Sequence, residues 1–222
     1  MVLEDVGEQC ANGACPEDRR AFLRALGGIH GRGRRLTESG KFCDSPLPRF
    51  PPSQWHYSEW DRLLALGLES PEYALVDWMP NLLDYVRTKV EAEPLTLIQG
   101  DPDYSNVVLS DSGIALVDWE YAMIGPASAD LGRALEPVES PDELESYRSA
   151  REEAGAERLS HGVISELADV GIALNSLRWI CYYIKRVSDG KDPGEDWRRT
   201  HYVPCIERLH TVRARRPDWC ET

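Results

Sequence analysis

The sequence predicts a mainly α-helical α+β fold with one small β-hairpin. Long segments carry apolar residues at helical spacing, and short runs of β-type residues interrupt them between residues 106 and 117. The 222 residues are enough to bury a core without disulfides. No apolar run approaches the roughly 20 residues that span a bilayer.

Helical segments are expected along most of the chain. Residues 16–30 begin with a proline and two acids, which suit the first turn of a helix, and carry an apolar stripe. We expect Gly31 and Gly33 to end this helix and residues 32–54 to form a loop. Further helices are expected at residues 55–68, 71–90, 128–135, 139–158, 160–187 and 197–215.

The β-hairpin is predicted from two short runs around a turn. Residues 106–109 and 114–117 are rich in β-branched and apolar side chains. The turn between them, Ser-Asp-Ser-Gly, ends in a glycine. The hairpin follows a short apolar run at residues 95–98.

The charge is strongly negative in the middle third of the chain. The formal net charge is −13, and residues 91–169 hold 18 acids and 4 bases. Such a field repels phosphodiester backbones and attracts cations, so we expect no nucleic-acid partner. We interpret the acids from Glu136 to Glu157 as a solvated helix face.

The first 18 residues and the cysteines indicate the compartment. Residues 1–18 carry five acids and no base, which is unlike a signal or transit peptide. The six cysteines form no CxxC pair, and without an export signal we expect free thiols in a reducing cytosol. Because no apolar run is long enough to span a bilayer, we expect no membrane partner.

Three polar residues in the centre of the chain suggest a reactive site. Asp101 follows the short apolar run, Asn106 lies five residues later, and Asp118 follows the second run of the hairpin. Because a hairpin folds its two ends together, Asn106 and Asp118 should lie side by side and offer oxygen ligands to Mg²⁺. Asp101 would then accept a proton from a hydroxyl, as in phosphoryl transfer.

The same segment resembles the signature of the aminoglycoside phosphotransferase and choline kinase superfamily. The chain reads Gln99-Gly100-Asp101-x4-Asn106, then Asp118-Trp119-Glu120, then Gly125-Pro126-x3-Asp130-Leu131. The resemblance implies the helical C-terminal lobe of a protein-kinase-like fold with ATP and Mg²⁺ as cofactors. It implies that Asp101 is catalytic and that the metal is bound by Asn106, Asp118 and Glu120. Asp130 would support the loop, and Gln99 would do so in place of the family's usual histidine.

The N-terminal residues extend this resemblance. Val2, Leu3, Glu4 and Asp5 resemble the hinge that offers backbone groups to adenine, so the resemblance implies a hinge-like segment 1–15 and one catalytic lobe, 16–222. A glycine-rich loop and a strand lysine are missing from the sequence, so we expect an absent N-terminal lobe or a partner chain that supplies it. The expected function is ATP-dependent phosphorylation of a hydroxyl on a small, cationic molecule, aminoglycoside- or amino-alcohol-like. The alternative is a catalytically inactive, truncated remnant that acts as a binding module.

Several aromatic residues leave two interpretations open. Trp119 is expected in the core rather than as a substrate platform. Trp78, Trp179, Tyr182 and Tyr183 line either a pocket for a cationic substrate or the core, and core packing is favoured. The five histidines, including His30, are expected at the surface or at helix ends.

Overall fold

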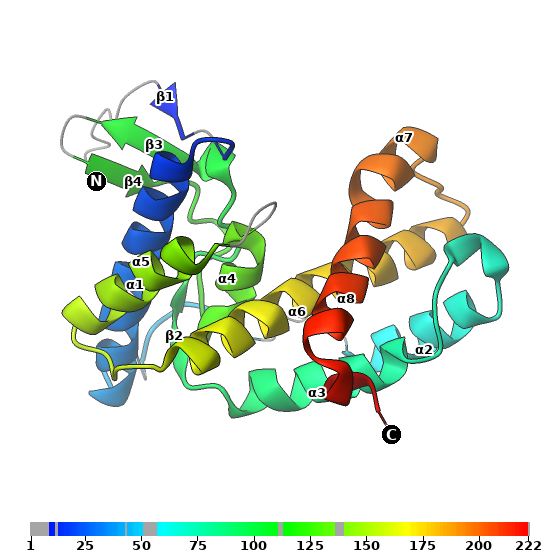
Figure 1. The fold of residues 1–222 in the computed structure, drawn as a ribbon, viewed down its shortest axis with the longest axis horizontal. Coiled ribbons are helices and arrows are strands. Elements are labelled where there is room, and N and C mark those ends of the chain that lie inside the picture. The colour runs from blue at the N-terminus through cyan, green and yellow to red at the C-terminus, as the bar shows by residue number, and fades with distance from the viewer. Residues whose placement is uncertain are drawn as a thin grey trace. The chain divides into compact units, whose positions relative to one another are not determined.

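The computed structural model describes residues 9–11, 13–42, 44–50, 57–110, 113–135 and 140–221. Helices dominate and the strands are short, which confirms the predicted fold class (Figure 1). The chain divides into two compact units: residues 1–50 with 93–168, and residues 51–92 with 169–222. In the part of the chain that is described, no helix combines the length and apolar character needed to cross a membrane.

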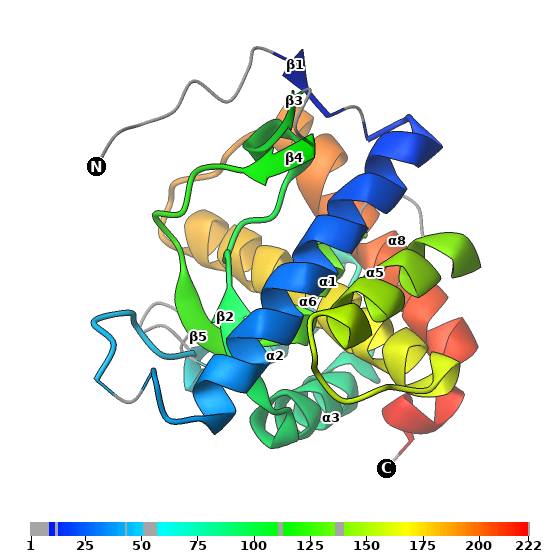
Figure 2. The same cartoon turned by 90° about the vertical axis from the view of Figure 1, so that its left-hand side faces the viewer.

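The first unit combines helices with two small antiparallel sheets. Its helices are α1 (Pro16–Glu38), α4 (Ala127–Ala134), α5 (Pro141–Glu153) and the beginning of α6 (His161–Ser188). Its strands are β1 (Gln9–Cys10), β2 (Leu95–Ile98), β3 (Val107–Ser110), β4 (Gly113–Leu116) and β5 (Met123–Pro126), and a 3₁₀ turn spans Tyr104–Asn106. Figure 2 shows α1 lying beside α5. Together with α4, their apolar faces form a core that includes Phe22, Leu26, Leu131, Leu144 and Tyr147.

The predicted hairpin is confirmed. β3 and β4 pair antiparallel with Val107 opposite Leu116, and Val117 donates a backbone hydrogen bond to the Asn106 carbonyl. β1 adds a third strand to this sheet. The pairing of β2 with β5 was not predicted, because β5 is only four residues long and ends at Pro126.

The prediction that glycines end the first helix is wrong, and so is the loop predicted from residue 32. α1 continues through Gly31 and Gly33 to Glu38. A Cβ atom at residue 31 would lie 2.5 Å from the Arg151 carbonyl oxygen, and one at residue 33 would lie 2.6 Å from the Leu97 nitrogen. These glycines therefore let α1 approach α5 and β2 closely.

A buried ion pair joins the start of α1 to α5. Arg19 Nε lies 2.5 Å from Glu143 Oε1, and the Glu143 side chain is 1% exposed. Glu143 also completes a capping box with Ser140 at the start of α5. The interpretation of residues 136–157 as a solvated face is therefore wrong at Glu143, whose buried carboxylate pairs with Arg19.

The second unit is helical. It contains α2 (Tyr57–Leu68), α3 (Met79–Ala92), the remainder of α6, α7 (Glu195–Trp197) and α8 (Val203–Arg215), with a π turn over Arg198–Tyr202 and 3₁₀ turns over Pro71–Tyr73 and Pro217–Cys220. The helix expected from residue 71 therefore starts at residue 79. In the core, Tyr202 donates a 2.6 Å hydrogen bond to the Tyr73 carbonyl, and the buried Asp169 carboxylate pairs with Arg215 and Arg216.

The close approach of α1 predicts opposite effects for two glycines of the same helix. Gly31→Ala should lower the free energy of unfolding by about 1–3 kcal/mol, because the new methyl group overlaps the α5 backbone. Gly28→Ala should raise it by about 0.5–1 kcal/mol, because a Cβ there meets only the flexible Arg32 guanidinium at 3.5 Å. Urea denaturation of both variants tests this, and stabilisation by Gly31→Ala would contradict the close packing.

Candidate active site

The Asp101 loop leaves β2 and is held by the carboxylate of Asp130 in α4. Asp130 Oδ2 accepts a 2.7 Å hydrogen bond from the Gln99 backbone N–H, and Oδ1 accepts a 2.9 Å bond from that of Gly100. The Asp130 side chain is fully buried. Both of its oxygens therefore fix the two residues that precede Asp101.

The Gln99 side chain ties this loop to the end of the hairpin. Its Nε2 donates to the carbonyls of Val117 and Asp118, at 3.2 and 2.6 Å, and its Oε1 accepts from the Asp101 backbone N–H at 2.7 Å. A side-chain amide supplies both a donor and an acceptor, which this bridge requires. Asp118 has a φ of 55°, a left-handed conformation that is uncommon outside glycine.

Asp101 stands next to Asn106 at the mouth of the hairpin. The Asp101 side chain is 44% exposed, so its carboxylate is open to a ligand. Asn106 Nδ2 donates a 3.0 Å hydrogen bond to the Asp101 carbonyl oxygen. Because the amide nitrogen makes this hydrogen bond, the amide oxygen is the atom of Asn106 that suits a cation.

Three carboxylates raise the pKa of the Tyr121 phenol. The hydrogen bond with Glu120 raises the Tyr121 pKa most, and the negative charges of Glu120, Asp101 and Asp118 raise it further. All three acids therefore lie within electrostatic reach of the same phenol. Carboxylate and amide oxygens are the kind of ligand that hard cations such as Mg²⁺ prefer. The described residues contain no group of three or more His, Cys, Asp or Glu side chains already arranged around a metal position.

Sequence reasoning missed His30. It was expected at the surface or at a helix end, but it is 1% exposed in the middle of α1. Its Nε2 lies 3.1 Å from Asp130 Oδ2 and its Nδ1 lies 2.8 Å from the Tyr147 hydroxyl. With a proton on Nε2, the imidazole donates to the Asp130 carboxylate, and its other nitrogen faces the Tyr147 hydroxyl. The error follows from the misplaced end of α1.

Arg133 is a second residue that the motifs did not indicate. It lies one turn after Asp130 in α4, and its Nε is 3.5 Å from Asp101 Oδ1. Its NH2 lies 2.8 Å from Asp103 Oδ2. Burial alone would raise the pKa of Asp103, but hydrogen bonds from Ser105 and the charge of Arg133 lower it below the usual value. Arg133 therefore orients two carboxylates of the loop.

The family profile described as the phosphotransferase enzyme family matches residues 3–163. This chain belongs to the phosphotransferase enzyme family. The match spans the Asp101 loop, the hairpin and α4. Comparison with curated proteins gives no match.

Solved structures share the fold of this family member at low sequence identity. A choline/ethanolamine kinase family protein from Mesorhizobium loti is 17% identical, with a TM-score of 0.57 over 89% of this chain and 63% of its own. The choline kinase LicA from Streptococcus pneumoniae is 17% identical, with a TM-score of 0.56 over 92% of this chain and 67% of its own. A putative aminoglycoside phosphotransferase from Ralstonia eutropha JMP134 is 14% identical, with a TM-score of 0.56 over 96% and 71%. This chain therefore spans about two thirds of the length of these proteins.

The site residues predicted from the sequence stand as follows in this phosphotransferase family member. Hydrogen bonds connect Gln99 to Asp101, Asp118 and Asp130, and Asn106 to Asp101. The side chains of Asp118 and Glu120 are exposed, and both charges act on the Tyr121 phenol. Val2, Leu3, Glu4 and Asp5 lie outside the described residues. Trp119 was expected in the core but is 37% exposed, because its indole N–H turns back to the Leu116 carbonyl.

The Glu93 carboxyl anchors the start of α4. Its Oε1 accepts a 3.0 Å hydrogen bond from the Ser128 backbone N–H at the start of the helix. Burial raises the pKa of Glu93 to about 7, although the hydrogen bonds from Ser128 and Ala127 oppose the rise. The carboxyl therefore titrates near neutral pH while it holds the helix that carries Asp130 and Arg133.

This raised pKa predicts a pH dependence of stability. An ordinary glutamate titrates near 4.5, so the folded protein binds Glu93's proton more tightly than the unfolded chain does. Stability from this group is fully present below about pH 4.5 and is lost as the pH rises to about 7. Relative to Glu93→Gln, the free energy of unfolding of wild type should fall by up to about 3 kcal/mol over that pH range and should not fall further at higher pH.

Chemical denaturation of both proteins from pH 4.5 to 8 measures this difference. Glu145→Gln is the matched control, because hydrogen bonds from Arg148 and Ser149 lower the pKa of the Glu145 carboxyl to about 2, outside that range. Parallel stability curves for wild type and Glu93→Gln would show that Glu93 has an ordinary pKa.

Proposed function

We propose that this chain transfers the γ-phosphoryl group of ATP to a hydroxyl of a small, cationic molecule. The arrangement of the Asp101 loop carries the proposal: a half-exposed carboxylate on a loop fixed by Asp130 and bonded to Asn106. Membership in the phosphotransferase family supports this reaction class. Another structure of LicA, described as a complex with AMP, supports nucleotide binding.

Asp101 is the proposed catalytic residue. Its carboxylate accepts the proton of the substrate hydroxyl as the oxygen attacks phosphorus. Arg133 holds the Asp101 carboxylate on one side, so a hydroxyl approaches from the solvent side. Gln99 and Asp130 keep the loop backbone in place without touching the substrate.

Asn106, Asp118 and Glu120 are the proposed ligands of Mg²⁺. When bound, the cation would neutralise the charge of the triphosphate. The left-handed backbone at Asp118, whose carbonyl accepts from Gln99, fixes where that carboxylate leaves the hairpin. The backbone of residues 2–5 is the proposed contact for adenine, and the hinge-like segment 1–15 and catalytic lobe 16–222 belong to the same proposal.

The proposed acceptor is an amino alcohol or an aminoglycoside. The carboxylates of Asp101, Asp118 and Glu120 create a negative field that favours a cationic molecule. Proteins of similar fold are described as choline and ethanolamine kinases and as a putative aminoglycoside phosphotransferase.

Nucleotide binding tests the metal ligands. Calorimetric titration with ATP should show binding that requires Mg²⁺. In Asp118→Ala, ATP should bind at least about tenfold more weakly and Mg²⁺ should no longer strengthen the binding, because one charged metal ligand is lost. Asp142→Asn, an exposed carboxylate of α5, is the matched control and should bind as wild type does. Equal Mg²⁺-dependent affinity of wild type and Asp118→Ala would contradict the assignment.

Phosphoryl transfer tests the catalytic residue. Asp101→Asn should bind ATP and Mg²⁺ within about twofold of wild type but transfer phosphate roughly 10²–10⁴ times more slowly, because the amide cannot accept the hydroxyl proton. The assay is ³¹P NMR with a panel of amino alcohols and aminoglycosides. Full activity of Asp101→Asn would refute its role, and the absence of transfer by wild type would refute the proposed function.

A further inference from the structure

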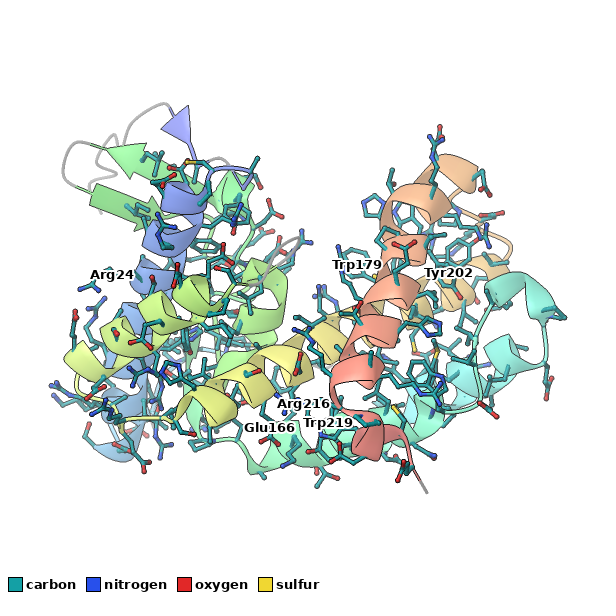
Figure 3. The ribbon with its side chains drawn as sticks, viewed as in Figure 1. Arg24, Glu166, Trp179, Tyr202, Arg216 and Trp219 are labelled. Carbon is teal, nitrogen blue, oxygen red and sulfur yellow. The ribbon has the colours of Figure 1, made fainter. Side chains whose placement is uncertain are left out.

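The four aromatic residues for which the sequence leaves two interpretations lie in the second unit. Trp78 and Tyr183 are buried there, so core packing is confirmed for these two. Trp179, which Figure 3 labels, is half-buried, and Tyr182 is 43% exposed. The described hydrogen bonds of the Asp101 loop are instead made within the first unit.

Asp103 lies between the proposed catalytic residue and the proposed metal ligand Asn106, at a position that the motif leaves open. One oxygen of its carboxylate, Oδ1, accepts hydrogen bonds from the Ser105 backbone N–H at 2.9 Å and from the Ser105 hydroxyl at 2.8 Å. These bonds cap the 3₁₀ turn Tyr104–Asn106 at its start. The other oxygen, Oδ2, lies 2.8 Å from Arg133 NH2. The carboxylate therefore joins the turn that ends in Asn106 to α4.

The backbone of the same turn connects Asp103 to both neighbouring site residues. Its N–H donates a 2.8 Å hydrogen bond to the Asp101 carbonyl oxygen, and its carbonyl accepts a 2.9 Å bond from the Asn106 N–H. The Asp101 carbonyl oxygen also accepts from Asn106 Nδ2, at 3.0 Å. The Tyr104 hydroxyl donates to the Ala134 carbonyl at 3.2 Å and anchors the turn to α4 a second time. A displacement of Asp103 would therefore move the Asn106 side chain.

We propose that Asp103 is a positioning residue for the metal site: its carboxylate holds the 3₁₀ turn so that the Asn106 amide nitrogen stays bonded to Asp101 and the amide oxygen is left for the cation. This role rests on the function proposed above, in which Asn106 is a ligand of Mg²⁺. Asp103 is not itself a ligand, because its oxygens are engaged by Ser105 and Arg133. The alternative is that Asp103 attracts Mg²⁺ through its charge alone, without any effect on Asn106.

The side-chain amide of Asn106 gives a readout that requires neither nucleotide nor metal. Its ¹⁵N NMR signal is identified by its absence in Asn106→Asp. In Asp103→Ala, hydrogen exchange of this amide with water should become at least about threefold faster, because its bond to the Asp101 carbonyl opens more often. Asp103→Asn keeps an oxygen that can accept from Ser105, so its exchange rate should lie between those of wild type and Asp103→Ala.

Asp192 in the second unit provides the matched control. Its Oδ1 accepts a 2.8 Å hydrogen bond from the Gly194 backbone N–H, two residues later, as Asp103 Oδ1 does from Ser105. Asp192→Ala therefore removes the same side chain and the same kind of local bond. It should leave the Asn106 exchange rate and the Mg²⁺ requirement as they are in wild type.

Calorimetry tests the consequence for the metal. In Asp103→Ala, the Mg²⁺ concentration that half-saturates the binding of ATP should rise at least about fivefold, because a ligand oxygen is no longer held in place. The rise should be smaller in Asp103→Asn. A role limited to protein stability would lower the fraction of folded chain but would leave this Mg²⁺ concentration unchanged.

The outcomes separate this role from the proposed function. If Asn106 exchanges at the same rate in Asp103→Ala as in wild type, or if Asp192→Ala accelerates it equally, Asp103 does not position Asn106. Equal shifts of the Mg²⁺ requirement in Asp103→Ala and Asp103→Asn would show that the charge of Asp103 acts by itself. If wild type binds no ATP with Mg²⁺, the proposed function fails, and the exchange rates still decide whether Asp103 holds Asn106.

Discussion

The buried carboxylate of Asp130 is the interaction on which the candidate active site depends. An ionised group inside a protein is costly unless every oxygen is satisfied, and here the Gln99 and Gly100 backbone N–H groups and His30 do this. The same hydrogen bonds determine where Asp101 leaves the loop. Any change that frees the Asp130 carboxylate would therefore release the proposed catalytic residue as well.

This carboxylate depends in turn on how closely α1 can pack. His30 reaches Asp130 from the middle of α1, and its own carbonyl accepts a 2.7 Å hydrogen bond from Thr96 in β2. The neighbouring Gly31 and Gly33 leave room for α5 and for β2. Larger residues there would move the imidazole away from Asp130. Two glycines with no chemistry of their own thus support the geometry of the site.

The sequence predicts what is local and misses what depends on tertiary contacts. Helical spacing and turn residues predict most helices and the hairpin, and motif spacing identifies Asp101, Asn106 and Asp130 as candidate site residues. The end of α1 is misplaced because glycine usually ends helices, and only the proximity of α5 and β2 explains why Gly31 and Gly33 do not. Arg133, Glu93 and the pairing of β2 with β5 carry no local signal, since each acts across more than 20 residues of sequence.

Net charge also proves a poor guide to individual ligands. The excess of acids suggests cationic partners for the whole chain, and the carboxylates around Tyr121 agree with that expectation. Glu59 shows the opposite case, because Lys185 lies 2.6 Å from its carboxylate and compensates its charge. Ion pairing within a few ångströms determines the sign of the field that a ligand meets, whereas charges beyond about 10 Å are largely screened. The sign of the field at the Asp101 loop is therefore set by its own carboxylates and by Arg133, and not by the charge of the whole chain.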